Sequence, residues 1–292
     1  MATIEPDVGV ALLGPGLLGT ALATSLLASE AVDLRLVAGR EGDGAELEAL
    51  AARGMETSAL GIDAVLDRDD VEIVFDATTE AAQAEHAVRL LAAGKKVVDL
   101  TPSGAERAVV PVINLDSARG RPQLHLVSSA TQVAVPLIHA LDLEVGVEYA
   151  EIVATIAGAS AGPGTRLNVD GLTAGTAAAA RTVGGATEAK AMVFFGPGGP
   201  ERAMMATIFL RPREPDEPRV LAAVVGACER LAAALPGFEL GECSRDGDRV
   251  TVRVEVRGSG EADAVAPSLA PIIAAATAVG ESLSGRLSGA RA

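Results

Sequence analysis

Short runs of apolar residues alternate with helical patterns through the first part of the chain. The runs are nearly uninterrupted, as in strands that are buried on both faces of a parallel sheet. They cover residues 8–14, 34–39, 71–78, 95–101 and 124–129. A segment of helical spacing between two of them ends at Gly94, a residue typical of helix C-termini. This alternation predicts an α/β fold with a doubly wound parallel sheet.

The pattern changes after about residue 131. Apolar and polar residues now alternate in the predicted strands, which is typical of a sheet with one exposed face. These strands cover residues 147–158, 191–196, 204–210 and 250–256. We therefore expect a Rossmann-type first domain over residues 1–130 and a second, α+β domain over residues 131–263. A last helix of small residues follows over residues 264–285.

Composition and charge exclude several classes of function. The net charge of −15 argues against nucleic acid or an anionic membrane surface as a partner. Cys228 and Cys243 are far apart, so we expect neither a disulfide framework nor a metal site. The start of the chain does not resemble a signal peptide, and no apolar run is long enough to span a membrane. We expect a cytoplasmic protein.

A glycine-rich loop lies between the first predicted strand and the first predicted helix. It reads Gly14-Pro15-Gly16-Leu17-Leu18-Gly19, the GxGxxG pattern in the context that dinucleotide binding requires. Gly14 permits a tight turn, Gly16 lets the backbone approach a pyrophosphate, and Gly19 lets the helix pack on the strand. Leu17 and Leu18 lie in the first turn of the helix, where their free backbone N–H groups face the phosphates. The alternative is a plain glycine turn.

The end of the second predicted strand bears on the choice of cofactor. Arg40 is the first polar side chain after this strand, and its guanidinium can bind the 2'-phosphate of NADP. In the alternative, Arg40 is a solvated surface residue, Glu41 binds the ribose and the cofactor is NAD. We favour NADP. Thr78 follows the third strand, at the sheet edge where the nucleotide lies.

Nearly the whole chain resembles the acylating acetaldehyde dehydrogenases, which partner 4-hydroxy-2-oxovalerate aldolases. The most specific segment is SAGPGTRLNVD, residues 160–170. The resemblance implies a Rossmann domain, a catalytic and dimerisation domain, and a C-terminal helix that returns to the first domain. It also implies a homodimer, an aldolase-like partner, and Asn168 as a residue near the active site.

This sequence departs from the family at four positions. The family's nucleophilic cysteine falls on Ser129, in the segment VSSATQVAVP. An aspartate that assists the cysteine falls on Ala206, and an asparagine that holds the nicotinamide falls on Ser268. An acidic residue after the second strand falls on Arg40. A neutral hydroxyl is a poorer nucleophile than a thiolate, and the local sequence offers Ser129 no base.

The bend at residues 128–131 supplies hydroxyls in place of a thiol. Ser128 and Ser129 can hydrogen-bond a carbonyl oxygen of the substrate. Alternatively, Ser129 only caps a helix that starts near Thr131.

Other polar residues are weaker candidates. We expect His86 on the surface, His139 in a structural role and Tyr149 in the core, and we keep His125 as a weak candidate. The SAGPGTRLNVD loop also has a purely structural interpretation, in which Asp170 caps the following helix.

These features predict an NADP(H)-dependent oxidoreductase that transfers hydride directly to or from a small carbonyl or imine substrate, without a thioester. One alternative is an acylating, coenzyme A-dependent aldehyde dehydrogenase that a Cys-to-Ser change has inactivated. The other is a non-catalytic, nucleotide-binding partner subunit.

Overall fold

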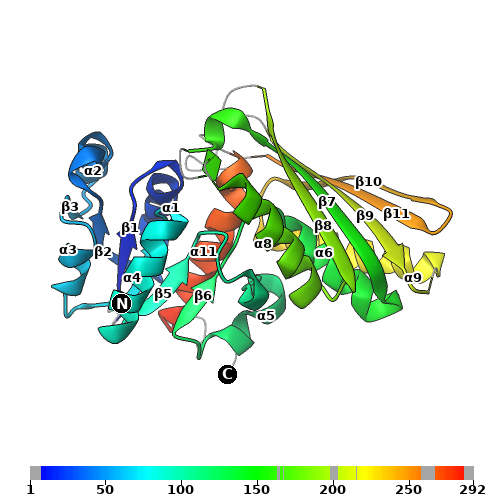
Figure 1. The fold of residues 1–292 in the computed structure, drawn as a ribbon, viewed down its shortest axis with the longest axis horizontal. Helices are drawn as coiled ribbons and strands as arrows, with labels where there is room; N and C mark the ends of the chain where they lie inside the picture. Colours follow the sequence, from blue (N-terminus) through cyan, green and yellow to red (C-terminus); the bar gives the residue numbers. More distant parts are fainter. Residues whose placement is uncertain are drawn as a thin grey trace.

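Two sheets organise the chain, one in each half of the sequence (Figure 1). The computed structural model describes residues 8–162, 165–166, 168–197, 203–214, 216–257 and 267–285. The mixed α/β architecture confirms the predicted fold class.

The first sheet has six strands, all parallel, in the order β3-β2-β1-β4-β5-β6. The strands are β1 (Gly9–Leu13), β2 (Asp33–Ala38), β3 (Thr57–Ser58), β4 (Val71–Asp76), β5 (Lys96–Asp99) and β6 (Gln123–His125). The order reverses at β1, so the crevice beside β1 and β4 is the switch point where nucleotides bind in such sheets.

Helices bury both faces of this sheet. They are α1 (Leu17–Ala28), α2 (Gly44–Ala51), α3 (Ile62–Leu66), α4 (Glu80–Ala92), α5 (Pro111–Ala118) and α11 (Ala270–Leu283). One core joins the sheet to α1 and α11 through residues such as Leu22 and Ile272. The other joins it to α3 and α4 through Val65 and Leu90. The last helix therefore packs on the first half of the chain.

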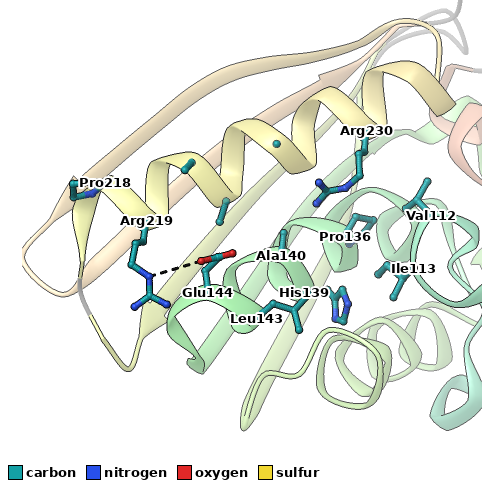
Figure 2. Close-up of a pocket in the computed structure, with 13 residues that line it drawn as sticks. Val112, Ile113, Pro136, His139, Ala140, Leu143, Glu144, Pro218, Arg219 and Arg230 are labelled. Carbon is teal, nitrogen blue, oxygen red and sulfur yellow. Dashed lines mark ion pairs between the residues drawn. The ribbon is translucent and has the colours of Figure 1, made fainter.

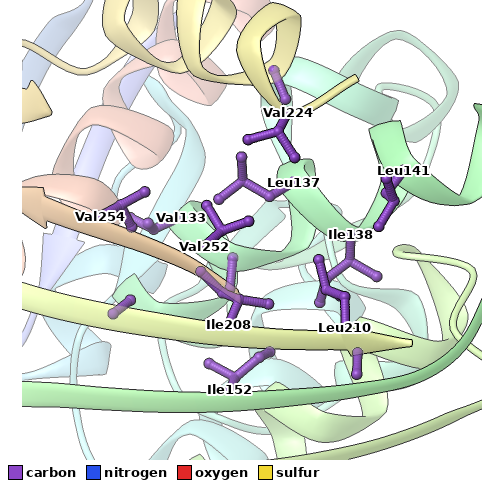
Figure 3. Packing of buried hydrophobic residues seen from close by; sticks show 14 of the residues in the cluster. Val133, Leu137, Ile138, Leu141, Ile152, Ile208, Leu210, Val224, Val252 and Val254 are labelled. Carbon is purple, nitrogen blue, oxygen red and sulfur yellow. The ribbon is translucent and has the colours of Figure 1, made fainter. Parts of the chain in front are cut away.

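The second sheet is mixed and has the order β10-β11-β9-β7-β8. Its strands are β7 (Val147–Ala157), β8 (Glu188–Gly196), β9 (Met204–Pro212), β10 (Phe238–Asp246) and β11 (Arg249–Val256). Only β7 and β8 are parallel to each other. The helices α6 (Ser129–Val145), α8 (Val169–Thr182) and α9 (Glu217–Ala234) contribute to its core, and α11 adds Ala270. Figure 3 shows α6 side chains such as Leu137 meeting Ile208 of β9.

The other face of the second sheet carries exposed apolar side chains. Thr155 pairs with Phe194 on one side and with Met205 on the other, so the three side chains share a face. Phe194 is 52% exposed and Met205 is 47% exposed. Tyr149 lies on the same face and its hydroxyl donates to Glu151. The expectation that Tyr149 is a core residue is therefore wrong.

The elements differ from the sequence-based expectations in four further places. β3 and β10 were not predicted, because β3 has two residues and β10 is mostly exposed and polar. Helix α6 begins at Ser129, not near Thr131, and Ser128 is its cap. His86 is not a surface residue, because its side chain is only 16% exposed and bonds the buried Asp76. Asp170 lies within the first turn of α8, whose N-cap is Asn168.

The packing of α6 can be tested with two leucines of the same helix. Leu137 is fully buried, whereas Leu143 is 71% exposed. We expect Leu137→Ala to lower the free energy of unfolding by about 2–5 kcal/mol, because it opens a cavity. Leu143→Ala should change it by less than about 0.5 kcal/mol. Urea unfolding followed by circular dichroism measures both, and equal effects would contradict this assignment of the core.

Candidate functional site

The glycine loop has the geometry that a dinucleotide needs. Gly14 has a φ of 90°, and a Cβ there would lie 2.9 Å from Ala77 O and from Thr78 Cγ2. A Cβ at Gly19 would lie 1.9 Å from Gly14 O, so only glycine lets α1 pack this closely. A Cβ at Gly16 would meet nothing within 4 Å. The backbone at Gly16 thus faces open space at the start of α1, where a pyrophosphate fits.

The first turn of α1 leaves its amides available. Gly16 is the N-cap and offers no side chain to the helix. The first turn, which includes Leu17 and Leu18, contains no acidic residue that would compete with a phosphate. The residues present therefore fit the pyrophosphate of a dinucleotide.

Arg40 and Asp43 lie together at the end of β2. The exposed Arg40 makes no ion pair with any of the described residues. Asp43 Oδ2 accepts a hydrogen bond from the Arg40 backbone amide at 2.7 Å. A Cβ at Gly39 would lie 2.9 Å from the same Oδ2 and 2.7 Å from Pro15 Cγ. The Asp43 carboxylate thus lies close to both the end of β2 and the glycine loop. Asp43 is a polar group at this position that sequence reasoning missed.

Thr78 lies beside the glycine loop at the end of β4. Its amide and hydroxyl both donate to Asp76 Oδ1, at 3.0 and 2.5 Å. His86 Nδ1 lies 2.9 Å from the other oxygen of the same buried carboxylate. These contacts hold Thr78 in place beside Gly14 of the glycine loop.

The bend from β6 into α6 holds the two serines in different ways. Ser128 Oγ accepts from Thr131 N at 3.0 Å and lies 2.9 Å from the hydroxyls of Thr131 and Thr176. Ser128 is 4% exposed and caps the helix. Its hydroxyl is thus fully used inside the protein. Thr176, on α8, is a partner that the sequence pattern did not reveal.

Ser129 is the first residue of α6, and its side chain is partly exposed. Its hydroxyl makes no hydrogen bond to any of the described residues. In this conformation, then, no described side chain acts as a base on it. The hydroxyl is available to a ligand.

The two cysteines lie away from the bend, in α9 and β10. Burial raises the pKa of the Cys228 thiol to about 11 and also raises the pKa of Cys243. Since the thiolate is the nucleophilic form, neither cysteine replaces a thiol at the bend. Ala206 is 1% exposed in the core of the second sheet and carries no acid–base group.

A second buried carboxylate lies at the ends of β5 and β6. Asp99 Oδ2 lies 2.9 Å from His125 Nδ1 and accepts from Ser103 Oγ at 2.5 Å. The ring of His125 fills the space where a Cβ of Gly104 would lie, 2.3 Å from the nearest ring atoms. These contacts hold the loop after β5, and no hydrogen bond joins His125 to Ser129 among the described residues.

Asn168 joins the two halves of the chain. Its amide donates to the carboxylate of Glu80, in the first turn of α4, two residues beyond Thr78. Arg166 bonds the carbonyl oxygens of Gly158 and Ala161. The SAGPGTRLNVD loop is thus tied to the nucleotide edge of the first sheet at Asn168. Residues 163, 164 and 167 of the loop lie outside the described part of the chain.

Ser268 has a buried hydroxyl that finds no partner among the described residues. It lies in a short 3₁₀ helix, Pro267–Leu269, before α11. It is 1% exposed, and its Oγ makes no hydrogen bond. A buried polar group without a partner is costly, so a bound ligand that supplies one fits this position.

A sizeable cavity lies elsewhere in the described part of the chain. It measures about 680 Å³ and lies between α5, α6 and α9, where Figure 2 shows His139 and Arg230 beside it. It runs along α6 from Pro136 to Glu144, away from the helix start that holds Ser129. It supplies no thiol or hydroxyl nucleophile, so we place the candidate site at the bend and the glycine loop.

Comparison with known proteins identifies the family. A model described as "Homoserine dehydrogenase, NAD binding domain" matches residues 14–105. One described as "Prokaryotic acetaldehyde dehydrogenase, dimerisation" matches residues 129–262. The acetaldehyde dehydrogenase of Desulfitobacterium hafniense is 40% identical over 259 residues, 87% of each chain. The chain belongs to the acetaldehyde dehydrogenase family. The resemblance to these enzymes is confirmed, and the protein is an NAD(P)-dependent oxidoreductase.

Further comparisons agree with this family. The acetaldehyde dehydrogenase of Carboxydothermus hydrogenoformans is 36% identical over 254 residues, 87% of this chain and 85% of its own. A solved structure of aspartate semialdehyde dehydrogenase II from Vibrio cholerae shares the fold, with a TM-score of 0.65 at 15% identity. It covers 95% of this chain and 98% of its own. The matched dimerisation domain supports a homodimer.

The described residues offer neither a membrane-spanning helix nor a cluster of metal ligands. None of the described helices combines the length and the apolar character needed to cross a membrane. No group of three or more His, Cys, Asp or Glu side chains within the described ranges is arranged to hold a metal ion.

The glycine loop can be tested at the position that faces open space. We expect Gly16→Ala to leave the melting temperature unchanged, because no protein atom lies near the added methyl group. The methyl group occupies the approach of the pyrophosphate, so affinity for the nicotinamide cofactor should fall about tenfold or more. Gly120→Ala, which also meets open space but lies after α5 and away from the glycine loop and Arg40 in sequence, is the control. Calorimetric titration measures both, and equal affinities would contradict this placement of the cofactor.

Proposed function

We propose that this family member is an NADP(H)-dependent oxidoreductase that transfers hydride directly to or from a small carbonyl or imine substrate, without a thioester. The family supports an oxidoreductase on this scaffold. The finer assignment rests on the residues of this chain.

The observation that carries the proposal is the chemistry available at the bend. Ser129 occupies the position that the family resemblance assigns to the nucleophile, and its hydroxyl has no hydrogen-bonded base among the described residues. A serine without a base is a weak nucleophile. Both thiols of the chain lie elsewhere, with raised pKa values. Hydride transfer needs no covalent step, so it is the chemistry compatible with these groups.

Each candidate residue has a role in this proposal. The bound nicotinamide supplies or accepts the hydride. The Ser129 hydroxyl donates a hydrogen bond to the carbonyl oxygen, which lowers the energy of the charge that develops there. Ser128 holds the helix start, and Asn168 holds the loop of the second half against α4. The cofactor-binding set is Gly14, Gly16, Leu17, Leu18, Gly19, Arg40, Thr78 and Ser268.

A direct test measures oxidation of NADPH with a panel of small aldehydes, ketones and imines, with and without coenzyme A. We expect turnover that does not depend on coenzyme A, and for Ser129→Ala a kcat lower by about tenfold to a hundredfold, the scale of losing one hydrogen bond to a developing charge. Ser244→Ala, at an exposed serine of β10 that bonds Glu242, is the control. Acyl-coenzyme A formed from aldehyde at ordinary rates would contradict the proposal.

One alternative is supported by the relatives themselves, which are named acetaldehyde dehydrogenases. If acylating chemistry is native to this chain and only the nucleophile is missing, Ser129→Cys restores oxidation of aldehydes with coenzyme A. The absence of a carboxylate at Ala206 is an argument against it, since the new thiol would lack the assisting acid of the family.

Arg40 supports NADP over NAD in this proposal. Its guanidinium has no ion partner among the described residues, so the 2'-phosphate would supply one. The nearby Asp43 carboxylate repels a phosphate but is held by the Arg40 amide. The preference therefore depends on the guanidinium outweighing the carboxylate.

We expect Arg40→Ala to weaken NADPH binding by about tenfold or more, the scale of a hydrogen bond to a charged group, and to leave NADH binding unchanged. Glu41→Gln, its exposed neighbour, is the control and should leave both affinities unchanged. Fluorescence titration of the two reduced cofactors measures the effect. If Glu41→Gln weakens NADH binding and Arg40→Ala leaves NADPH binding unchanged, the cofactor is NAD.

We also propose that two copies join through the open face of the second sheet. The face carries Phe194 and Met205, and it lies within the range of the dimerisation model. We expect Phe194→Asp to convert dimers to monomers in sedimentation experiments, because it places a charge in an apolar contact. Leu60→Asp, at an exposed leucine of the first half, is the control. A dimer unchanged by Phe194→Asp would place the interface elsewhere.

A further inference from the structure

The bend between β6 and α6 has a strained backbone. Among the described residues, Val127 is the non-glycine residue with a positive φ, 65°. Ser128 N donates to Leu126 O at 2.9 Å, a hydrogen bond that spans a single residue. A positive φ with this bond is the pattern of the rarer form of γ-turn. β-Branched residues are particularly disfavoured there, so other contacts must hold the turn.

The side chain of Val127 supplies one of these contacts. It is 1% exposed and packs in an apolar cluster with Val110 just before α5, Val135 of α6 and Ala179 of α8. Helix α8 passes close by, since a Cβ at Gly175 would lie 3.1 Å from Val127 Cγ1. A glycine at 127 would relieve the backbone but would empty its place in this cluster.

Hydrogen bonds hold the backbone on both sides of Val127. Before it, Leu126 O also accepts from the buried Gln132 Nε2 at 2.8 Å, and the same Nε2 donates to Val109 O at 2.9 Å. After it, Ser128 Oγ lies 2.9 Å from the hydroxyls of Thr131 and Thr176. The turn is thus fixed from α6, from α8 and from the segment before α5.

We propose that Val127 is a positioning residue, whose strained turn sets the direction in which Ser129 presents its hydroxyl to the substrate. This inference rests on the proposed function. The Ser129 hydroxyl has no partner among the described residues. The backbone sets the direction of the Cα–Cβ bond of Ser129, and hence the region that the hydroxyl can reach. Strand β6 ends at His125 and α6 begins at Ser129, so the turn at Val127 determines how the first turn of the helix is oriented.

Two matched variants separate positioning from packing. Val127→Ala and Val110→Ala remove the same two methyl groups from the same cluster, but only the first lies in the turn. We expect the two variants to lower the melting temperature by similar amounts. For Val127→Ala we expect kcat to fall about tenfold or more with cofactor affinity unchanged, because a misplaced group loses catalysis rather than binding. Val110→Ala should keep kcat within about twofold. Equal kcat values for the two folded variants would overturn the proposal.

A second measurement does not depend on turnover. Ser129→Cys places a reporter thiol in the first turn of α6, where the helix dipole lowers the pKa of a thiol. The rate of its alkylation by iodoacetamide is measured as a function of pH, and the rate for the chain without Ser129→Cys is subtracted. The remaining pH dependence gives the pKa of the reporter thiol. We expect Val127→Ala, combined with the reporter, to raise the pKa towards the free value, about 8.5. Val110→Ala should leave it unchanged. The same pKa in both backgrounds overturns the proposal.

The two measurements also distinguish this proposal from the proposed function. If the native chain reduces no carbonyl or imine on the panel, the proposed function fails and the reporter thiol alone decides the role of Val127. If Val127→Ala does not fold, Val127→Gly takes its place, because glycine adopts a positive φ without strain. It also lacks the side chain that locks the turn, so we expect the same changes in kcat and in the reporter pKa.

Discussion

The turn from β6 into α6 is the constraint on which the rest of the molecule depends. Helix α6 begins at the carboxyl edge of the first sheet and then runs through the core of the second, with twelve of its residues buried. Two residues, Leu126 and the strained Val127, separate the strand from the helix cap. The contacts that hold this turn come from both halves of the chain, so the candidate site and the junction of the two sheets share one set of interactions.

The chemistry of the site follows from what lies at that junction. The glycine loop retains open space and unused amides for a pyrophosphate, and the buried Ser268 hydroxyl has no partner in the described part of the chain. At the bend, a hydroxyl without a base occupies the place of a nucleophile. A scaffold that holds a nicotinamide beside a hydrogen-bond donor can still move hydride, because that step needs polarisation of a carbonyl and not a covalent intermediate.

Local pattern was sufficient for much of the fold but not for the details of the site. Apolar runs gave the central strands β1, β4 and β5, and the glycine spacing gave the start of α1, because these depend on neighbours in sequence. β10 was not predicted, because the sequence of an exposed edge strand contains few apolar residues. His86 is partly buried and bonds Asp76, ten residues away, and the hydroxyl of Ser128 contacts that of Thr176 on α8. No periodicity reveals such contacts, nor the positive φ of Val127, since sequence patterns favour glycine or asparagine there.

The fate of the hydride tests the central claim most directly. The measurement uses NADPH that carries deuterium at C4 of the nicotinamide, a carbonyl substrate and no coenzyme A, followed by mass spectrometry of the product and of the peptide that contains Ser129. The account predicts deuterium on the former carbonyl carbon of the product and an unmodified Ser129 peptide. An acyl group on that peptide, or a product formed only when coenzyme A is added, would contradict it.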